Sequence, residues 1–161
     1  MKEMYCFIVV NYNNSNLSVS CVKSIFEQSS DNVDVIVVDN NSTVEEKQVL
    51  QELENQSNVD IIYLNENIGY FPALVKGQEL AYLKYDYTYL ILANNDLIFG
   101  ADFVRTLSLL KVESNVMVIS PDIVTIDGVH QNPHFVNKLS CLRKFLYSIY
   151  YKTYYISLIM N

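Results

Sequence analysis

The sequence has little positive charge. It contains 11 Lys and Arg residues against 18 Asp and Glu residues, which gives a formal net charge of -7 at pH 7. Binding to a nucleic-acid backbone needs a basic surface, so this balance argues against nucleic acid as a partner, and against a broad electrostatic hold on anionic lipid. A small phosphate-bearing ligand fits the balance if a metal ion or helix N-termini screen its charge locally.

Cysteine is also scarce, and the three that occur have no ligand spacing. Cys6, Cys21 and Cys141 form no CxxC pair and no Cys/His pattern. We therefore favour free thiols, buried in the case of Cys6 and Cys21, over disulfides or a metal site. His130 and His134 lack a zinc-binding spacing as well, and we assign both to loops.

Long hydrophobic runs, repeats and Gly/Ser-rich linkers are absent. No uninterrupted apolar stretch reaches the roughly 20 residues that a membrane-spanning helix needs, and the first residues lack the cleavage site of a signal peptide. We therefore expect a cytoplasmic chain. Its 161 residues, half of them apolar, predict one domain over 1–135, followed by a tail over 136–161.

Apolar runs and helical patterns alternate along the chain. Strands are predicted at 5–10, 33–38, 61–64, 87–92 and 116–119, and helices at 17–26, 44–53, 73–83 and 103–110. Ser15 or Asn16 is expected to cap the first helix, and Thr43 with Glu46 has the spacing of a capping box. Because the strands are apolar throughout, we expect an α/β fold: an open, mainly parallel sheet with helices on both faces.

Polar clusters follow four of these strands, at 11–14, 39–42, 65–69 and 94–96. Open α/β sheets bind ligands in the crevice outside the carboxyl ends of their strands. Ordinary turn chemistry explains any one cluster equally well, since Asn, Asp and Gly are preferred in turns. Four clusters that also carry carboxylates favour a binding site.

Two carboxylates within these clusters have a chemistry of their own. Asp39 follows an apolar strand and can accept a hydrogen bond from a base N–H or a ribose hydroxyl. Its alternative role is to cap the turn or helix that begins at Ser42 and Thr43. Asn94 and Asp96 offer hard oxygen ligands two residues apart, which suits Mg²⁺ or Mn²⁺ bridging two phosphates.

The clusters together resemble the family 2 glycosyltransferases of the GT-A fold, in particular a rhamnosyltransferase-like branch that builds bacterial surface polysaccharides such as capsule and O-antigen. The matching segments are 9–13, 37–42, 65–70, 92–96, 120–123, 127–128 and Gln131. The resemblance implies an inverting transfer from a UDP- or dTDP-sugar to a glycan or lipid-linked acceptor. It also implies a Mg²⁺ or Mn²⁺ ion that neutralises the departing nucleoside diphosphate.

The resemblance carries site roles onto individual residues. The metal ligands would be Asp96 and Asn94, at the position of the family's DxD motif. The donor-binding residues would be Asn11, Tyr12, Asn13, Asp39, Asn41, Asn67, Gly69, Lys76 and Asn95. Here Asp39 would hold the base or ribose, and Lys76 stands where the family often has an Arg beside the base and phosphates.

Three departures from the family pattern leave two hypotheses open. Asn94 replaces the first carboxylate of the motif, and Leu74 and Val75 replace amides that often precede the Lys76 position. Nothing after Gln131 looks like the segment with the carboxylate general base, so no catalytic residue is assigned. The chain is then either a glycosyltransferase or a donor-binding module that needs a missing segment or a partner. An unrelated nucleotide-binding protein is disfavoured because GxGxxG and GxxxxGK[ST] are absent.

The tail over 136–161 has apolar residues at helical spacing, with tyrosines and basic residues around them. We favour a helix that packs on the rest of the protein. The alternative is an interfacial helix, which would place the chain at the inner face of the membrane or join copies of it.

Overall fold

The computed structural model describes residues 3–28, 32–131, 140–141 and 143–144. It divides into two compact units, Met1–Lys111 and Val112–Asn161, and each is considered by itself. The predicted domain boundary at 135/136 lies outside the described residues. So does the predicted tail, apart from four residues.

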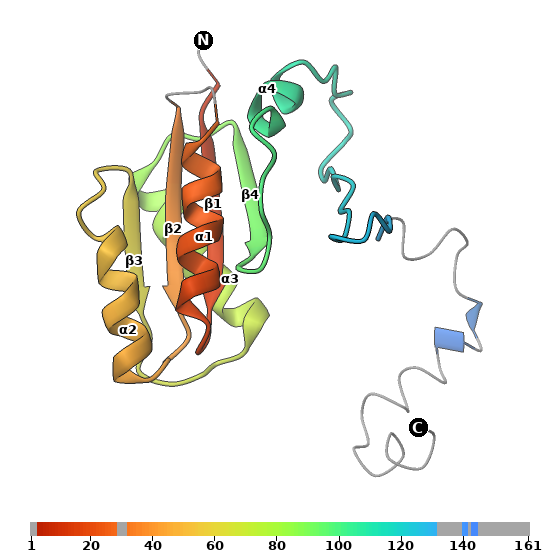
Figure 1. Cartoon of the computed structure of the whole chain (residues 1–161). Helices are drawn as coiled ribbons and strands as arrows, with labels where there is room; N and C mark the ends of the chain where they lie inside the picture. Colours follow the sequence, from red (N-terminus) through yellow and green to blue (C-terminus); the bar gives the residue numbers. More distant parts are fainter. Residues whose placement is uncertain (1–2, 29–31, 132–139, 142, 145–161) are drawn as a thin grey trace. The chain divides into compact units, whose positions relative to one another are not determined.

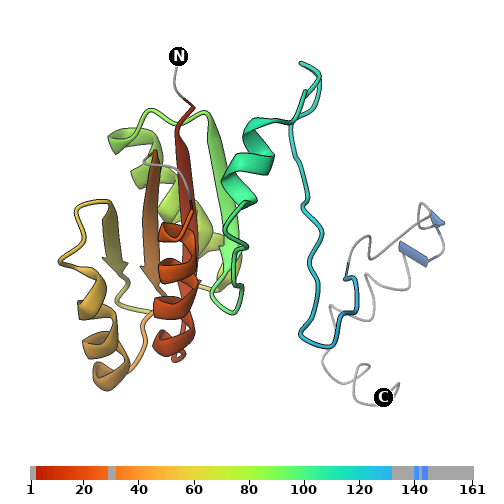
Figure 2. The same cartoon turned by 45° about the horizontal axis from the view of Figure 1, so that its top comes forward.

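The first unit alternates strands and helices, as the sequence predicts. Its elements are β1 (Tyr5–Asn11), α1 (Ser15–Phe26), β2 (Val33–Asp39), α2 (Val44–Leu50), the short 3-10 helix η1 (Gln51–Leu53), β3 (Val59–Tyr63), α3 (Tyr70–Lys84), β4 (Tyr89–Asn94) and α4 (Phe103–Ser108). The four strands pair in parallel in the order β3-β2-β1-β4 (Figures 1 and 2). This confirms the predicted α/β class with a parallel sheet.

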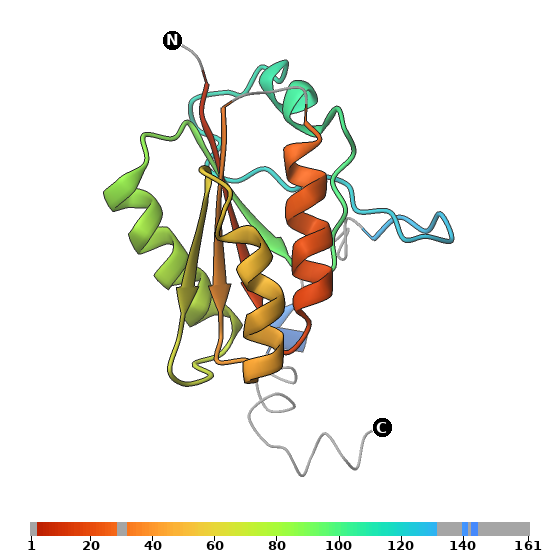
Figure 3. The same ribbon diagram turned by 60° about the vertical axis from the view of Figure 1, so that its left-hand side comes forward.

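Helices cover both faces of the sheet. Figure 3 shows α1 and α2 on one face and α3 on the other. Alternate residues of β1 accordingly belong to two cores: Phe7 packs in the cluster on the α1 side, and Ile8 packs in the cluster on the α3 side. All seven residues of β1 are buried, because a central parallel strand is covered on both sides. Double coverage therefore explains the uninterrupted apolar runs in the sequence.

Two glycines place α3 against the sheet. Gly77 lies so close to β1 that a Cβ atom there would overlap the side chain of Ile8. Gly69 precedes the first residue of the helix with a φ of 89°, a conformation that L side chains rarely adopt. The start of α3 is thereby fixed beside the carboxyl ends of the strands.

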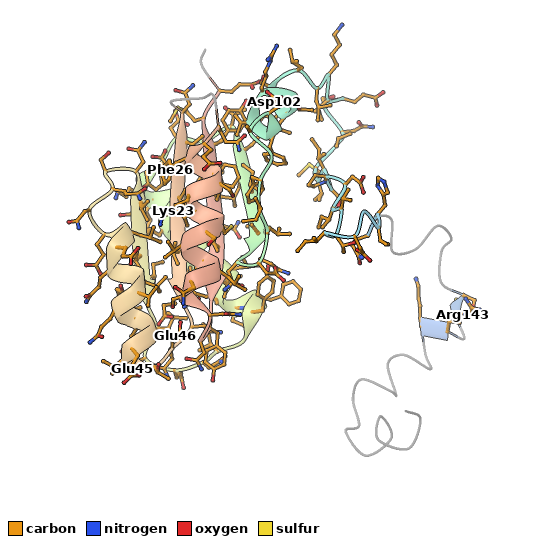
Figure 4. The ribbon with its side chains drawn as sticks, in the orientation of Figure 1. Lys23, Phe26, Glu45, Glu46, Asp102 and Arg143 are labelled. Carbon is orange, nitrogen blue, oxygen red and sulfur yellow. The ribbon has the colours of Figure 1, made fainter. Side chains whose placement is uncertain are left out.

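The helix caps differ from the prediction. α1 begins at Ser15, with Asn14 at the N-cap position and no side-chain cap, so Ser15 and Asn16 lie inside the helix. The backbone N–H of Ser15 instead donates to Oε2 of Glu46, over 2.6 Å. Of the predicted capping box only one half forms, from the Glu46 N–H to Oγ1 of Thr43. Figure 4 shows Glu46 in the first turn of α2.

The predicted strand at 116–119 is wrong. In the described part of the second unit these residues form no strand, and Met117 and Val118 are 89% and 83% exposed. An apolar run becomes a strand only where a neighbouring strand pairs with it, and none does here. His130 lies outside the helices and strands, as expected of a loop residue; it forms an isolated antiparallel bridge with Val124, and its Nδ1 is 2.6 Å from Oδ2 of Asp122. No helix in the described ranges has the length and hydrophobicity needed to cross a membrane.

Candidate functional site

The polar clusters of the first unit gather at one edge of the sheet. Asn11 at the end of β1 is the register partner of Asp39 at the end of β2, and Val10 pairs with Asn94 at the end of β4. Because the strands are parallel, their carboxyl ends share this edge. The two carboxylates of the predicted site, Asp39 and Asp96, therefore belong to the same edge of the sheet.

Asn11 connects the parts of this edge. Its side chain is fully buried, and its Nδ2 lies near Oδ1 of Asp39 at 2.9 Å and near the hydroxyl oxygens of Ser15 and Ser42 at 3.1 Å each. Its Oδ1 accepts from Oγ of Ser18 at 2.7 Å and from Nδ2 of Asn95 at 3.4 Å. A single amide thus links β1, β2, α1 and the segment after β4. A satisfied buried network of this kind holds its members in one arrangement.

Asp39 is completely enclosed. Its side chain is 0% exposed; Oδ1 accepts from Asn11, and Oδ2 accepts from the Ser42 N–H at 3.1 Å. The ammonium of Lys47 lies 3.9 Å from Oδ2. The contact with Ser42 is the turn-capping role that the sequence analysis kept as the alternative. The carboxylate thus has three partners within the protein.

Asn13 and Asn41 shape the turns after β1 and β2. Both have positive φ angles, of 51° and 65°, which asparagine tolerates better than most residues. The side-chain oxygen of Asn13 accepts from the Thr43 N–H at 2.9 Å. Between β1 and Asn13, Tyr12 is 51% exposed. These residues do perform turn chemistry, and they leave Tyr12 facing solvent at the edge.

Asn40 links β2 to the start of α3. Its Nδ2 donates to Oδ1 of Asn67 at 2.9 Å, and its Oδ1 accepts from the Ile68 N–H at 3.0 Å. Asn67 in turn accepts from the Gly69 N–H at 3.0 Å. Asn67 and Gly69 therefore lie beside the end of β2. Asn40, which holds them there, is buried and was not assigned to the site from the sequence.

Among the described side chains of the cluster at 94–96, the one that forms hydrogen bonds is that of Asn95. Its Nδ2 contacts the backbone oxygen of Asn14 at 3.3 Å and Oγ of Ser18 at 3.1 Å, besides Asn11. Asn94 and Asp96 are exposed on either side of it. Within the described ranges, no hydrogen bond or ion pair engages the Asp96 carboxylate. Burial of Tyr70, at the start of α3, is the main cause that raises the pKa of its hydroxyl, and the negative charge of Asp96 raises it further.

An exposed carboxylate without a protein partner, two residues from an amide, suits a hard divalent cation. The residues that the structure describes contain no group of three or more His, Cys, Asp or Glu side chains that could hold a metal. A cation at Asp96 and Asn94 would therefore need ligands other than the His, Cys, Asp and Glu side chains of the described residues.

Lys76 forms no hydrogen bond or ion pair with another predicted site residue among those that the structure describes. It is exposed on α3, and its ammonium pairs with Glu79 at 2.8 Å. Exposed pairs of this kind contribute little to stability and exchange partners at little cost.

Sequence reasoning did not assign five residues to the site network: Ser15, Ser18, Ser42, Glu46 and Lys47. Ser15 and Ser18 are buried on the same face of α1 as Val22 and Ile25. Two hydroxyls within the apolar stripe of a helix were the available signal, because buried polar groups need partners. Nothing in the sequence marks Glu46 or Lys47 in this way, since charged residues on a short helix are usually solvated.

A parallel sheet with helices on both faces and polar side chains at its carboxyl edge defines a ligand-binding α/β domain. The family model described as "Glycosyl transferase family 2" matches residues 6–156, so the chain belongs to this family. No curated protein sequence matches the chain at a significant level.

Solved structures with a similar fold include a mannosyltransferase and TarS of S. aureus. The mannosyltransferase PcManGT from Pyrobaculum calidifontis, in complex with GDP-Man and Mn²⁺, is 21% identical, over 63% of this chain and 30% of that one, with a TM-score of 0.54. S. aureus TarS 1–349 is 17% identical, over 78% and 43%, with a TM-score of 0.55. Its complex with UDP-GlcNAc is 16% identical, over 78% and 41%, with a TM-score of 0.53. The chain thus spans less than half the length of these proteins, whose GT-A fold it shares.

Proposed function

We propose that this chain forms the donor half of a glycosyltransferase and holds a UDP- or dTDP-sugar at the carboxyl edge of its sheet. The observation that carries the proposal is the exposed carboxylate of Asp96, which has no hydrogen bond or ion pair among the described residues and belongs to the same edge as Asp39. Family membership and the nucleotide sugars bound to the similar structures support it.

The donor's nucleoside lies, in this proposal, over the ends of β1 and β2. Asp39 accepts from the base or the ribose, and Tyr12, Asn13 and Asn41 border the same place. Asn67 and Gly69 flank it from the start of α3. The buried amide of Asn11 and the partly buried amide of Asn95 support the site from behind, since their hydrogen bonds hold the other residues in position.

The diphosphate needs positive charge, and α1 cannot provide it. Helix N-termini bind anions because their first N–H groups are free, but here the Glu46 carboxylate already accepts from Ser15 and adds negative charge. We therefore assign the diphosphate to Asp96 and Asn94 through a Mg²⁺ or Mn²⁺ ion, and Lys76 of α3 is a further donor contact in this proposal. The ion would supply Lewis-acid neutralisation of the leaving nucleoside diphosphate.

The reaction in this proposal is an inverting transfer, as the family resemblance implies. The hydroxyl of a glycan or lipid-linked acceptor attacks the anomeric carbon, and the bond to the nucleoside diphosphate breaks. The acceptor's general base is not assigned to any residue of this chain. We place the chain in the branch that builds bacterial surface polysaccharides, on the motifs given above.

The second candidate function is donor binding without turnover, which the unassigned general base favours. A coupled nucleotide-release assay with UDP-, dTDP- and GDP-sugars separates the two. Release by this chain supports the transferase. Binding without release, combined with release by a longer chain that includes an acceptor part, supports the donor-binding module. No binding of any of these donors contradicts both.

A further inference from the structure

We infer that Lys47 is a specificity-determining residue of the donor site, which selects a base that presents an N–H next to a carbonyl, as uracil and thymine do. The inference rests on the proposed function, because it takes the base to lie against Asp39. It adds a residue that neither the family motifs nor the chain's sequence singles out.

The side chain of Lys47 reaches the end of β2 from α2. Side chains on a helix point toward its N-terminus, and the N-terminus of α2 follows directly after the Asp39 turn. The ammonium lies 3.9 Å from Oδ2 of Asp39 and 3.5 Å from Oδ1 of Asn41. Lys47 is thus the one cation paired with Asp39 among the described residues.

Lys47 is also the outermost of the partners that surround the Asp39 carboxylate. The other two, Asn11 and Ser42, are buried, whereas the Lys47 side chain is 29% exposed. A ligand that approaches Asp39 from solvent therefore meets the ammonium first. Because the lysine stem is flexible, the ammonium can move off Oδ2 while it stays beside the carboxylate.

The ammonium still has donors to offer. At 3.9 Å it does not form a hydrogen bond with Asp39, and at 3.5 Å its contact with Asn41 is at the limit of one. A lysine carries three N–H donors and no acceptor. Most of its hydrogen-bonding capacity is therefore available to a bound base.

Asp39 and Lys47 together present an acceptor beside a donor. Uracil and thymine present the complement, N3–H beside O4. Cytosine in the same position presents an acceptor N3 to the carboxylate and a donor N4–H₂ to the ammonium, so both contacts become repulsive. Contacts of this kind discriminate strongly, because the wrong base leaves charged groups unpaired.

UDP and CDP differ only at this edge of the base, which makes them the matched pair of ligands for a test. Calorimetric titrations of both, at saturating Mn²⁺, would compare the wild type with Lys47→Met, which keeps the stem and removes the charge. Lys47→Arg keeps the charge. Lys23→Met is the control. Lys23 is exposed on α1, about two helical turns after Ser15 at the start of that helix, and Figure 4 shows it well away from Glu46.

We expect the wild type to prefer UDP, and Lys47→Met to lower the preference for UDP over CDP about tenfold. Lys47→Arg and Lys23→Met should retain it, and melting temperatures should confirm that every variant is folded. An equal UDP-to-CDP ratio in wild type and Lys47→Met overturns the inference. If the wild type binds neither nucleotide diphosphate, the proposed function itself fails, and the two failures are thereby distinguished.

Discussion

Asp39 ends β2 and Asp96 follows β4 at the same edge of the sheet, yet the two carboxylates have opposite surroundings. Asp39 is entirely buried, with an amide, a backbone N–H and an ammonium around its oxygens. Asp96 is exposed and engages no described partner through a hydrogen bond or ion pair. The fold itself holds the first carboxylate in place, whereas the second has no described partner and is open to a cation.

The two carboxylates therefore have different roles, one in holding the fold together and one in binding, and the sequence motifs do not distinguish these roles. A buried carboxylate must be satisfied by the fold, and it then fixes the groups that satisfy it. An exposed carboxylate adds little to stability but can bind a cation. Asn11 and Asn95 lie between the two and connect the rigid part of the edge to the exposed part.

The largest expected effect is on stability. Asp39→Ala should lower the free energy of unfolding by about 3 kcal/mol, because it leaves Asn11, Ser42 and Lys47 without their shared partner. Asp96→Ala should change it by less than about 0.5 kcal/mol, as is usual for exposed positions. Urea denaturation of both variants measures this. Equal losses for the two would remove the distinction drawn above.

The second effect is on metal-dependent binding. Asp96→Ala should abolish the gain in UDP affinity that Mn²⁺ provides, at least about tenfold, because the ion loses its one carboxylate ligand. His134→Ala should leave the gain intact. Calorimetric titration of UDP with and without Mn²⁺ tests this, and an unchanged gain in the Asp96 variant would refute the metal assignment.

Asp39→Ala should weaken UDP binding even without metal. In the proposed site this carboxylate contacts the nucleoside, and it also holds the turn after β2, so we expect a loss of about fivefold. Titration in the presence of a chelator measures this metal-free affinity. An unaffected dissociation constant in a folded variant would count against the base or ribose role.

A smaller effect is expected for the residue that links the two carboxylates. Asn95→Ala removes the bonds from its amide to Asn14 and Ser18, so the Asp96 segment becomes less ordered. The Mn²⁺-dependent gain in UDP affinity should fall about threefold, with metal-free affinity unchanged. Asn16→Ala, at an exposed position of α1, is the matched control. A loss of metal-free affinity instead would mean that Asn95 contacts the nucleotide.

The smallest effect concerns the thiols. Burial is the main cause that raises the pKa of both Cys6 and Cys21 to about 12, so both remain protonated and unreactive at pH 8. Cys141 is exposed and should be alkylated by iodoacetamide first. Asp96→Ala should leave this order unchanged, whereas Asp39→Ala should expose Cys6 and Cys21 more often through local opening. Mass spectrometry of timed samples measures this.

The sequence predicted the strands and helices of the first unit well. β1 and β2 are covered on both faces, so nearly every residue of these strands is buried, and an uninterrupted apolar run predicts a buried strand. β1, β2 and β4 end one or two residues later than predicted, since Asn11, Asp39 and Asn94 still belong to the ladder although they are polar, whereas β3 ends one residue earlier. Residues 116–119 failed because an apolar run does not reveal whether a partner strand is present.

The site was predicted as a set of residues but not as an arrangement. Strand order brought Asp39 and Asp96 to one edge, as expected from parallel strands. The burial of Asn11 and Asp39 could not be predicted, because their enclosure depends on Ser18 of α1 and Lys47 of α2, side chains that come from other elements. Local sequence determines which groups are present, and tertiary packing determines which of them face a ligand.

The most direct test of the account is paramagnetic broadening by Mn²⁺ of backbone amide signals in the UDP-bound protein. Broadening should be strongest at Asn94 to Asp96 and around Asn11 to Asn14, whereas Tyr5 and Val33 at the opposite ends of their strands should keep their signals. In Asp96→Ala the pattern should disappear. Strongest broadening at Tyr5 and Val33, or an unchanged pattern in the variant, would contradict a donor site at this edge.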